Sequence, residues 1–142
     1  MRTLLIAAAA TAVLAGCASA PESGPQPGTL VVGTAQVRVN NADAATTTDV
    51  RCTVAGPLTT ITTGDGESGV SALVSNADGL VAKWVTIRDL GGFTGSFEAD
   101  LQGEAKVTRT GRTYDITGSA DGFDTDRPSF RSSGTFAVTV AC

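Results

Sequence analysis

The chain has 142 residues, with 10 Lys and Arg, 14 Asp and Glu and no His, so its formal net charge is −4. This length fits one domain. The acidic balance argues against a nucleic acid partner, because phosphate backbones attract basic surfaces. The lack of histidine excludes Ser-His-Asp and Cys-His catalysis as well as His-containing zinc sites.

Residues 1–16 are typical of a secretory signal peptide. Arg2 is followed by an apolar run from Leu4 to Leu14 and then by small residues. A run of about eleven residues is too short to cross about 30 Å of hydrocarbon as a helix, so it predicts export and cleavage. The sequence Leu-Ala-Gly-Cys at 14–17 resembles a bacterial lipobox, which implies cleavage before Cys17 and diacylglyceryl transfer to its sulfur. The alternative is an ordinary secretory signal with a chance cysteine.

The predicted lipidation site is therefore Cys17, and residues 17–28 are predicted to be the acylated cysteine and a flexible tether. Residues 18–28 contain three Pro, two Gly and no large apolar side chain. At about 3.1 Å per residue, such a linker spans on the order of 35 Å. Two or three acyl chains anchor a protein firmly. We therefore expect an exported protein that faces outward and is anchored to the cell membrane without spanning it.

Residues 29–142 are predicted to form a single all-β domain, because apolar residues recur there with a period of two. The first candidate strands are residues 30–39, 49–55, 58–63 and 69–75. The sequence Gly-Asp-Gly at 64–66 is a strong turn signal between the last two.

Residues 80–90 fit two patterns. Leu80, Val81, Trp84 and Val85 match a helical stripe, whereas Val81, Val85 and Ile87 match a strand interrupted by Lys83. The abundance of Val, Trp, Thr and Ile favours the strand.

The later strands alternate more cleanly. Residues 93–101 are expected to place Phe93, Phe97, Ala99 and Leu101 on one face. Strands at 104–110 and 113–120 are joined through Gly111, which supplies the positive φ of a tight hairpin. In the second of these, residues 114, 116, 118 and 120 are expected to face the core and residue 113 the solvent. The last strand is predicted at 135–142.

Strands at this spacing, with glycine-rich turns and no convincing crossover helix, predict an antiparallel β-sandwich or a partly closed barrel.

Two cysteines remain for the fold once Cys17 carries lipid. An even pair in an exported protein predicts a disulfide between Cys52 and Cys142. Cys52 shares a face with Val50 and Val54, and Cys142 shares one with Val140, so both are expected to point inward. The enclosed loop of about 90 residues corresponds to about 4 to 5 kcal/mol in the chain-entropy model. Redox chemistry is the alternative, and it favours nearby, exposed and acidified thiols.

Four stretches together resemble the mycobacterial LpqH lipoprotein antigen family. They are DVRCTVAG at 49–56, VSALVSNAD at 70–78, GEAKVTRTGRTYDITGSADG at 103–122 and FAVTVAC at 136–142. The resemblance covers residues from about 30 to 142, and the lipobox and tether precede it in the family's order. It implies an acylated cell-envelope protein of actinobacteria and a surface antigen. It also implies that the lipid terminus engages host pattern-recognition receptors, and it supplies no catalytic residues.

The densest acidic cluster consists of Asp121, Asp124 and Asp126. Calcium prefers six to eight oxygen ligands, and the spacing here is not that of an EF-hand, so a solvated turn is the favoured interpretation. We predict no metal, cofactor or catalytic residue.

Two other features have a structural and a functional interpretation. Trp84 is expected to pack in the core or at a sheet edge, with a ligand-stacking platform as the alternative. The threonines at 46–48 and 59–63 could accept O-linked sugar, although β-propensity explains the second run.

The favoured function is a lipid-anchored, non-catalytic display domain: an antigen, an adhesin or a module that binds an envelope component. A carrier of lipid or glycolipid is the alternative, and it requires apolar side chains beyond those that the core consumes. An enzyme is the third class, disfavoured by the missing histidine.

Overall fold

The computed structural model describes residues 26–142, which form ten β-strands and no α-helix. The strands are β1 Ala35–Val39, β2 Ala42–Thr47, β3 Val50–Ala55, β4 Leu58–Gly64, β5 Gly69–Ser75, β6 Val81–Leu90, β7 Phe93–Glu98, β8 Glu104–Thr110, β9 Thr113–Asp124 and β10 Ser132–Ala141. Within 26–142, no helix is long and apolar enough to cross a membrane.

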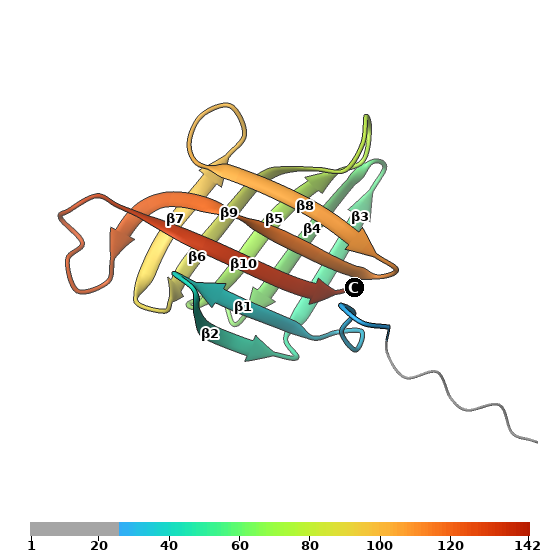
Figure 1. Cartoon of the computed structure of the whole chain (residues 1–142), viewed down its shortest axis with the longest axis horizontal. Helices are drawn as coiled ribbons and strands as arrows, with labels where there is room; N and C mark the ends of the chain where they lie inside the picture. The colour runs from blue at the N-terminus through green and yellow to red at the C-terminus, as the bar shows by residue number, and fades with distance from the viewer. Residues whose placement is uncertain (1–25) are drawn as a thin grey trace, which may run out of the picture.

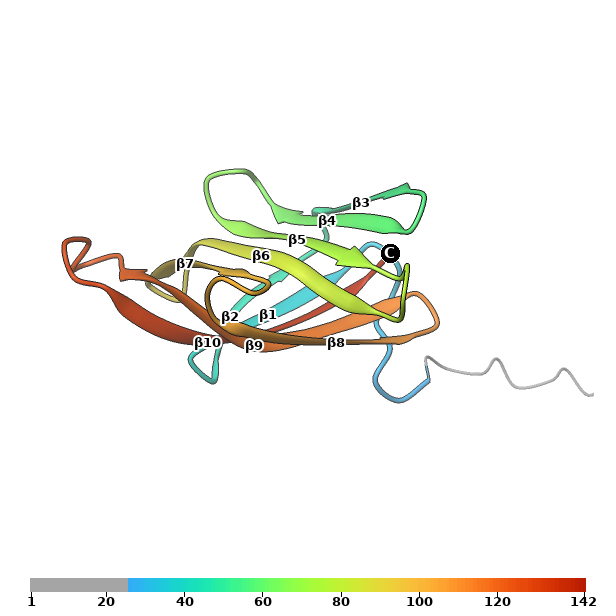
Figure 2. The ribbon, with the colours of Figure 1, turned by 90° about the horizontal axis from the view of Figure 1, so that it is seen from above.

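All ten strands belong to one antiparallel sheet with the order β2-β1-β10-β9-β7-β6-β5-β4-β3, and β8 pairs with β9 beside this path. The sheet curls so that β3–β6 lie opposite β1, β8, β9 and β10 (Figures 1 and 2). The pairing of β1 with β10 brings the two ends of the domain together. The predicted all-β fold is confirmed, in the form of a sheet that is nearly closed into a barrel.

The core lies between the two walls of this curled sheet. Its largest fully buried side chains include Phe93, Ile61, Ile87, Ile116 and Val138. They come from β7, β4, β6, β9 and β10, so each wall contributes its inward face. Burying a side chain of this size contributes about 1.5–3 kcal/mol.

Residues 81–90 form strand β6, as the side-chain composition favoured. The register shifts so that Ala82 pairs with Val74 and Trp84 pairs with Leu73, which leaves Lys83 without a partner in β5. This β-bulge explains the interrupted alternation around Lys83, because an extra residue reverses which face the following side chains occupy. Val81, expected in the core, is 46% exposed.

The first predicted strand is too long. Residues 30–34 form turns, and β1 begins only at Ala35, because Gly33 takes a positive φ of 81° that ends the extended backbone. The second strand, β2, was missed. Its sequence, ADAATT, has weak apolar alternation, and its pairing with β1 contains a register shift.

The strand predicted at 93–101 ends earlier, at Glu98. Asp100 takes a φ of 65°, and the Leu101 N–H donates to the Glu98 carbonyl in a turn. Leu101 is 79% exposed, so the prediction that it belongs to the core is wrong. Phe93 and Phe97 are buried as expected.

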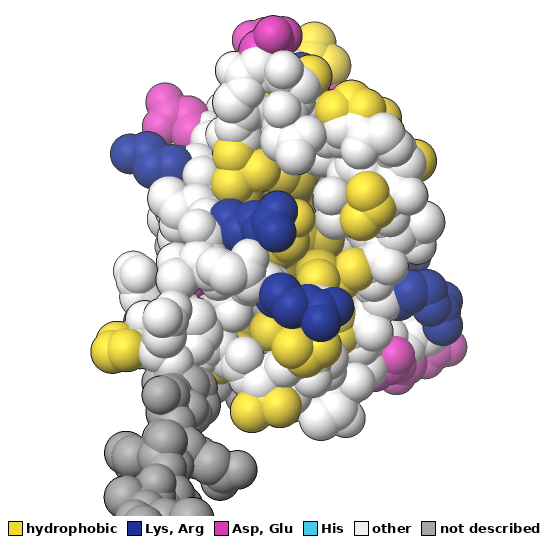
Figure 3. All heavy atoms as spheres, turned by 90° about the vertical axis from the view of Figure 1, so that its right-hand side faces the viewer, with side chains coloured by type: hydrophobic (Ala, Val, Ile, Leu, Met, Phe, Trp, Pro, Cys, Tyr) yellow, Lys and Arg dark blue, Asp and Glu magenta, His cyan; other side chains and the backbone are white. Residues whose placement is uncertain are grey.

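One end of the barrel carries the start of the described chain, the C-terminal residue and several hairpin turns (Figure 1). We call this region the tether end and define it by residues 26–34, 54–58, 75–81, 109–113 and 142. Apolar side chains line a hollow between the two walls there, and basic side chains lie across it (Figure 3).

Candidate functional site

The predicted lipidation site, Cys17, lies outside the described residues, as do the predicted signal peptide at 1–16 and the tether up to residue 25. The last three residues of the predicted tether are described, and they begin a turn. In this turn the Thr29 N–H donates to the Gln26 carbonyl oxygen at 2.9 Å. Residues 26–28 thus make their first described contact with the residue at which the domain was predicted to begin, Thr29.

The chain that follows this turn is hydrogen-bonded to the C-terminal strand, β10. The Gly33 N–H donates to the Ala141 carbonyl at 2.8 Å, and the Ala141 N–H donates to the Thr34 carbonyl at 3.0 Å. The Leu30 N–H donates to Thr113 Oγ1 at 3.1 Å. This contact explains why Thr113 is buried although its position in β9 predicted exposure. The segment that follows the tether, residues 30–34, is thus fixed against β9 and β10.

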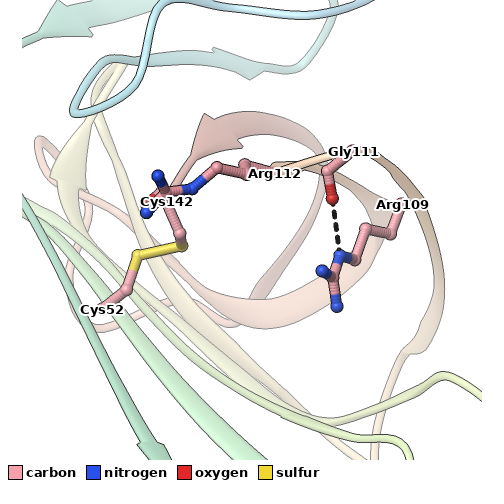
Figure 4. Close-up of a disulfide and its surroundings, with 5 residues drawn as sticks. All are labelled: Cys52, Arg109, Gly111, Arg112 and Cys142. Atoms are coloured by element: carbon pink, nitrogen blue, oxygen red, sulfur yellow. Dashed lines mark hydrogen bonds between the residues drawn. A yellow bond between two sulfur atoms is a disulfide. The ribbon is translucent and has the colours of Figure 1, made fainter.

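The structure joins Cys52 and Cys142 by a disulfide, with their Cα atoms 5.9 Å apart (Figure 4). β3 is the last strand of the sheet path and pairs only with β4. The disulfide therefore connects this edge strand covalently to the residue that follows β10. It closes across the gap that hydrogen bonds leave open, and it lies at the tether end.

Of two arginines in the β8–β9 hairpin, Arg112 lies beside Cys142, whereas Arg109 lies farther from the disulfide (Figure 4). Arg112 Nη2 donates to the Cys142 main-chain oxygen at 2.6 Å, while the Cys142 N–H donates to the Arg112 carbonyl at 2.9 Å. Arg109 Nε donates to the Gly111 carbonyl at 2.7 Å, and its guanidinium lies 5.4 Å from the centre of the Tyr114 ring. Both cations are held by carbonyl oxygens or an aromatic face.

A groove of about 480 Å³ lies between β6 and β8. Its lining is mostly apolar: Leu80, Val81, Ala82, Phe97, Ala99, Ala105 and Val107, with Asp100, Glu104 and Lys106 at the rim. It exists because β8 pairs with β9 while β7 pairs with the later part of β9, so that β6 and β8 face each other unpaired. The sequence analysis did not predict this groove. β6 and β8 are separated in the sequence by β7, and no local sequence pattern indicates that such strands lie side by side.

The predicted acidic cluster does not converge on one point. Asp121 accepts a hydrogen bond from Ser133 Oγ at 2.6 Å, and Asp124 forms an ion pair with Arg127 at 2.9 Å. Asp121 and Asp124 belong to β9, and only Asp126 lies in the loop. In residues 26–142, no group of three or more metal-ligating side chains could hold an ion.

Trp84 is half-buried and lies on the outer face of its wall, because its neighbours Val85 and Ile87 fill the core. Across the strands it is paired with Leu73 on β5 and Glu98 on β7. Trp84 therefore lies neither in the core nor at a sheet edge, where it was expected, but packs on the outer face of a strand that is paired on both sides.

Comparison with known proteins places the chain among mycobacterial lipoproteins. The profile of the Mycobacterium 19 kDa lipoprotein antigen family matches residues 28–142. A putative lipoprotein of Mycobacterium indicus pranii is 33% identical over 99% of this chain and 98% of its own length. The lipoprotein LpqH of Mycobacterium avium is 29% identical over 92% of this chain and 89% of its own.

A third relative, the probable lipoprotein LppE of Mycobacterium tuberculosis, is 33% identical over 68% of this chain and 70% of its own length. The chain belongs to the Mycobacterium 19 kDa lipoprotein antigen family. Members bear the name of lipoprotein or antigen, and the resemblance to LpqH that the sequence motifs indicated is confirmed.

Proposed function

We propose that this protein is a non-catalytic display domain, anchored to the outer face of the cell membrane by lipid on Cys17. The observation that carries the proposal is the junction at the tether end. There residues 30–34 are hydrogen-bonded to β9 and β10, and the Cys52–Cys142 disulfide closes the barrel beside them. Such a junction supports a stable fold at the end of a short linker outside the cytoplasm, where disulfides persist.

In this proposal the partners are recognised at two places. The acylated terminus is the part that host pattern-recognition receptors would bind, and the exposed sheet faces are available to envelope components. Many copies on one membrane compensate for weak individual contacts by raising the effective concentration.

The test replaces the predicted acceptor of the lipid. We expect Cys17→Ala to lose the acyl mass, to leave the detergent phase and to fail to activate receptor-bearing reporter cells. Cys52→Ala is the matched control, because it also removes one thiol but should keep the lipid. Full receptor activation by an unacylated Cys17→Ala protein would refute the proposal.

A second candidate function, a carrier of lipid or glycolipid, is supported by the apolar groove between β6 and β8. Its volume of about 480 Å³ is within the range of small-molecule sites. If the groove holds an acyl chain, Ala105→Phe should eliminate lipid that co-purifies in native mass spectrometry, whereas Ala42→Phe on the exposed β2 should not. Retention of the same lipid by both variants, or its absence from the wild type, would exclude this function.

A further inference from the structure

Exposed apolar side chains are concentrated at the tether end. Seven large hydrophobic residues are exposed in the described part of the chain, and five of them lie in this region: Val31, Val32, Val54, Leu58 and Val81. Leu58 of β4 pairs with Ser75 of β5, and Ser75 pairs with Val81 of β6. The β3–β4 hairpin and the start of β6 therefore lie side by side along one edge of the sheet. The other two, Leu101 and Phe130, lie in the loops at the opposite ends of β8 and β10.

Charge is distributed unevenly along the same axis. Arg109 and Arg112 lie at the tether end. Among the described turns at this end, Asp78 is the acidic side chain. Consecutive turns of an antiparallel meander lie at alternate ends of the strands. The β4–β5 turn with Asp65 and Glu67 is therefore at the opposite end, whereas the 125–131 loop there carries Asp126 together with Arg127 and Arg131. The two ion pairs of the described residues, Arg38–Asp43 and Arg127–Asp124, are also remote from the tether end.

The length of the linker restricts where this end can be. Eight residues lie between Cys17 and Gln26, and the nine steps from Cys17 to Gln26 reach at most about 32 Å at about 3.6 Å per residue. Because the described chain begins at the tether end, the linker to Cys17 joins the barrel at this end (Figure 1).

We propose that the tether end of the barrel rests on the anionic lipid surface of the membrane to which Cys17 is attached. The inference rests on the lipid anchor of the proposed function. Apolar hairpin side chains enter the boundary between headgroups and acyl chains, and Arg109 and Arg112 contact lipid phosphates. The opposite end, with the acidic β4–β5 turn, and the outer faces of the sheet then point away from the membrane. The tether keeps lipid permanently within reach, which favours a membrane over a second protein as occupant.

A depth-sensitive reporter tests this orientation, because the chain has a single tryptophan. In the full acylated protein, Trp84→Phe is combined with Leu58→Trp at the tether end or with Phe130→Trp at the opposite end. The protein is reconstituted into vesicles that carry acyl-brominated lipids, composed of phosphatidylcholine alone or with about one third phosphatidylglycerol. In anionic vesicles we expect bromine to quench the Leu58→Trp reporter several-fold more than the Phe130→Trp reporter.

Charge variants separate docking from anchoring. Arg109→Gln with Arg112→Gln should remove the excess quenching, whereas Arg127→Gln with Arg131→Gln removes two cations at the other end and should preserve it. Raising the salt from about 0.1 M to about 1 M shortens the Debye length from about 10 Å to about 3 Å and should also reduce the quenching. Thermal melting checks that each variant remains folded.

Flotation of the vesicles reads the anchor independently. If all variants float and both reporters are quenched equally, docking is refuted while the anchor stands. In neutral vesicles, quenching of the Leu58→Trp reporter could instead decrease as the protein density rises. That result would identify a second copy of the chain as the occupant and would likewise refute docking. Protein that does not float contradicts the anchor and the docking together.

Discussion

Gly118 occupies a position in β9 where any side chain would collide with the neighbouring strand. A Cβ atom there would overlap the carbonyl oxygen of Glu104 on β8. We predict that Gly118→Ala destabilises the fold by about 2 kcal/mol, because the backbone of β8 must move away. Thr117→Ala, exposed on the same strand, should change the urea midpoint little. Equal midpoints for both variants would show that β8 does not pack against β9 as described.

Asp65 organises the β4–β5 turn. Its Oδ1 accepts the N–H groups of Ser68 at 3.0 Å and of Glu67 at 3.1 Å. These hydrogen bonds, that from Ser68 first, lower the pKa of the Asp65 carboxyl below its ordinary value of 3.8. A lowered pKa in the folded state means that the charged form stabilises the fold above the ordinary pKa. That contribution disappears as the pH falls through the folded pKa.

Asp65→Ala should therefore lower the urea midpoint at neutral pH, and its difference from the wild type should shrink as the pH falls below 3.8. A carboxyl-carbon NMR titration of the wild type should show Asp65 titrating below an unstructured peptide aspartate. A pH-independent difference between the two proteins would mean that the ionised carboxylate is not what the turn requires.

The loop between β7 and β8 gives Phe97 and Leu101 different environments, although the alternating pattern predicted that both lie on the same buried face. Phe97 is 5% exposed and Leu101 is 79% exposed. We predict that Phe97→Ala costs about 3–5 kcal/mol, as is typical for a buried phenylalanine. Leu101→Ser should stay within about 0.5 kcal/mol of the wild type. Chemical denaturation measures both free energies of unfolding. A large loss of stability in Leu101→Ser would indicate that Leu101 is buried, as the longer predicted strand required.

At the scale of elements, the disulfide carries a large share of the stability. Cys52 and Cys142 are 90 residues apart in the sequence. For a loop of this length the chain-entropy model assigns about 4 to 5 kcal/mol to the disulfide. We expect the double variant Cys52→Ala with Cys142→Ala to melt about 15 to 20 °C lower, at about 4 °C per kcal/mol. Reduction of the wild type is the control and should produce the same shift. An unchanged melting temperature would show that hydrogen bonds alone close the barrel.

Local periodicity predicted most strands because their inward positions, such as Phe136, Val138 and Val140 in β10, alternate strictly. It failed where other forces set the backbone. At Lys83 a bulge reverses the alternation, at Asp100 a positive φ ends the strand, and at β2 small and polar residues carry no signal.

The candidate site was predictable only in its covalent part. The even pair of cysteines on inward faces predicted the disulfide. The groove beside Val107 and the apolar rim around Leu58 depend on which strands become neighbours. That is decided by packing over the whole sheet and leaves no trace in a short window of sequence.

At the scale of the whole molecule, the barrel has two different ends. The tether end contains the disulfide, exposed apolar hairpins and two arginines, and the opposite end carries the acidic β4–β5 turn. This polarity gives a small, tethered domain a defined orientation, which a uniformly polar barrel would lack. The surfaces that point away from the membrane would then be those that partners meet first.

The central claim is that lipid on Cys17 holds this barrel at a membrane. The most direct test is the intact mass of the wild-type protein extracted from its own membrane, followed by sequencing of its first residue. We predict a chain that begins at Cys17, carries a diacylglyceryl group and has both remaining thiols oxidised. A chain with an unmodified Cys17 thiol, or with residue 16 still attached, would contradict it.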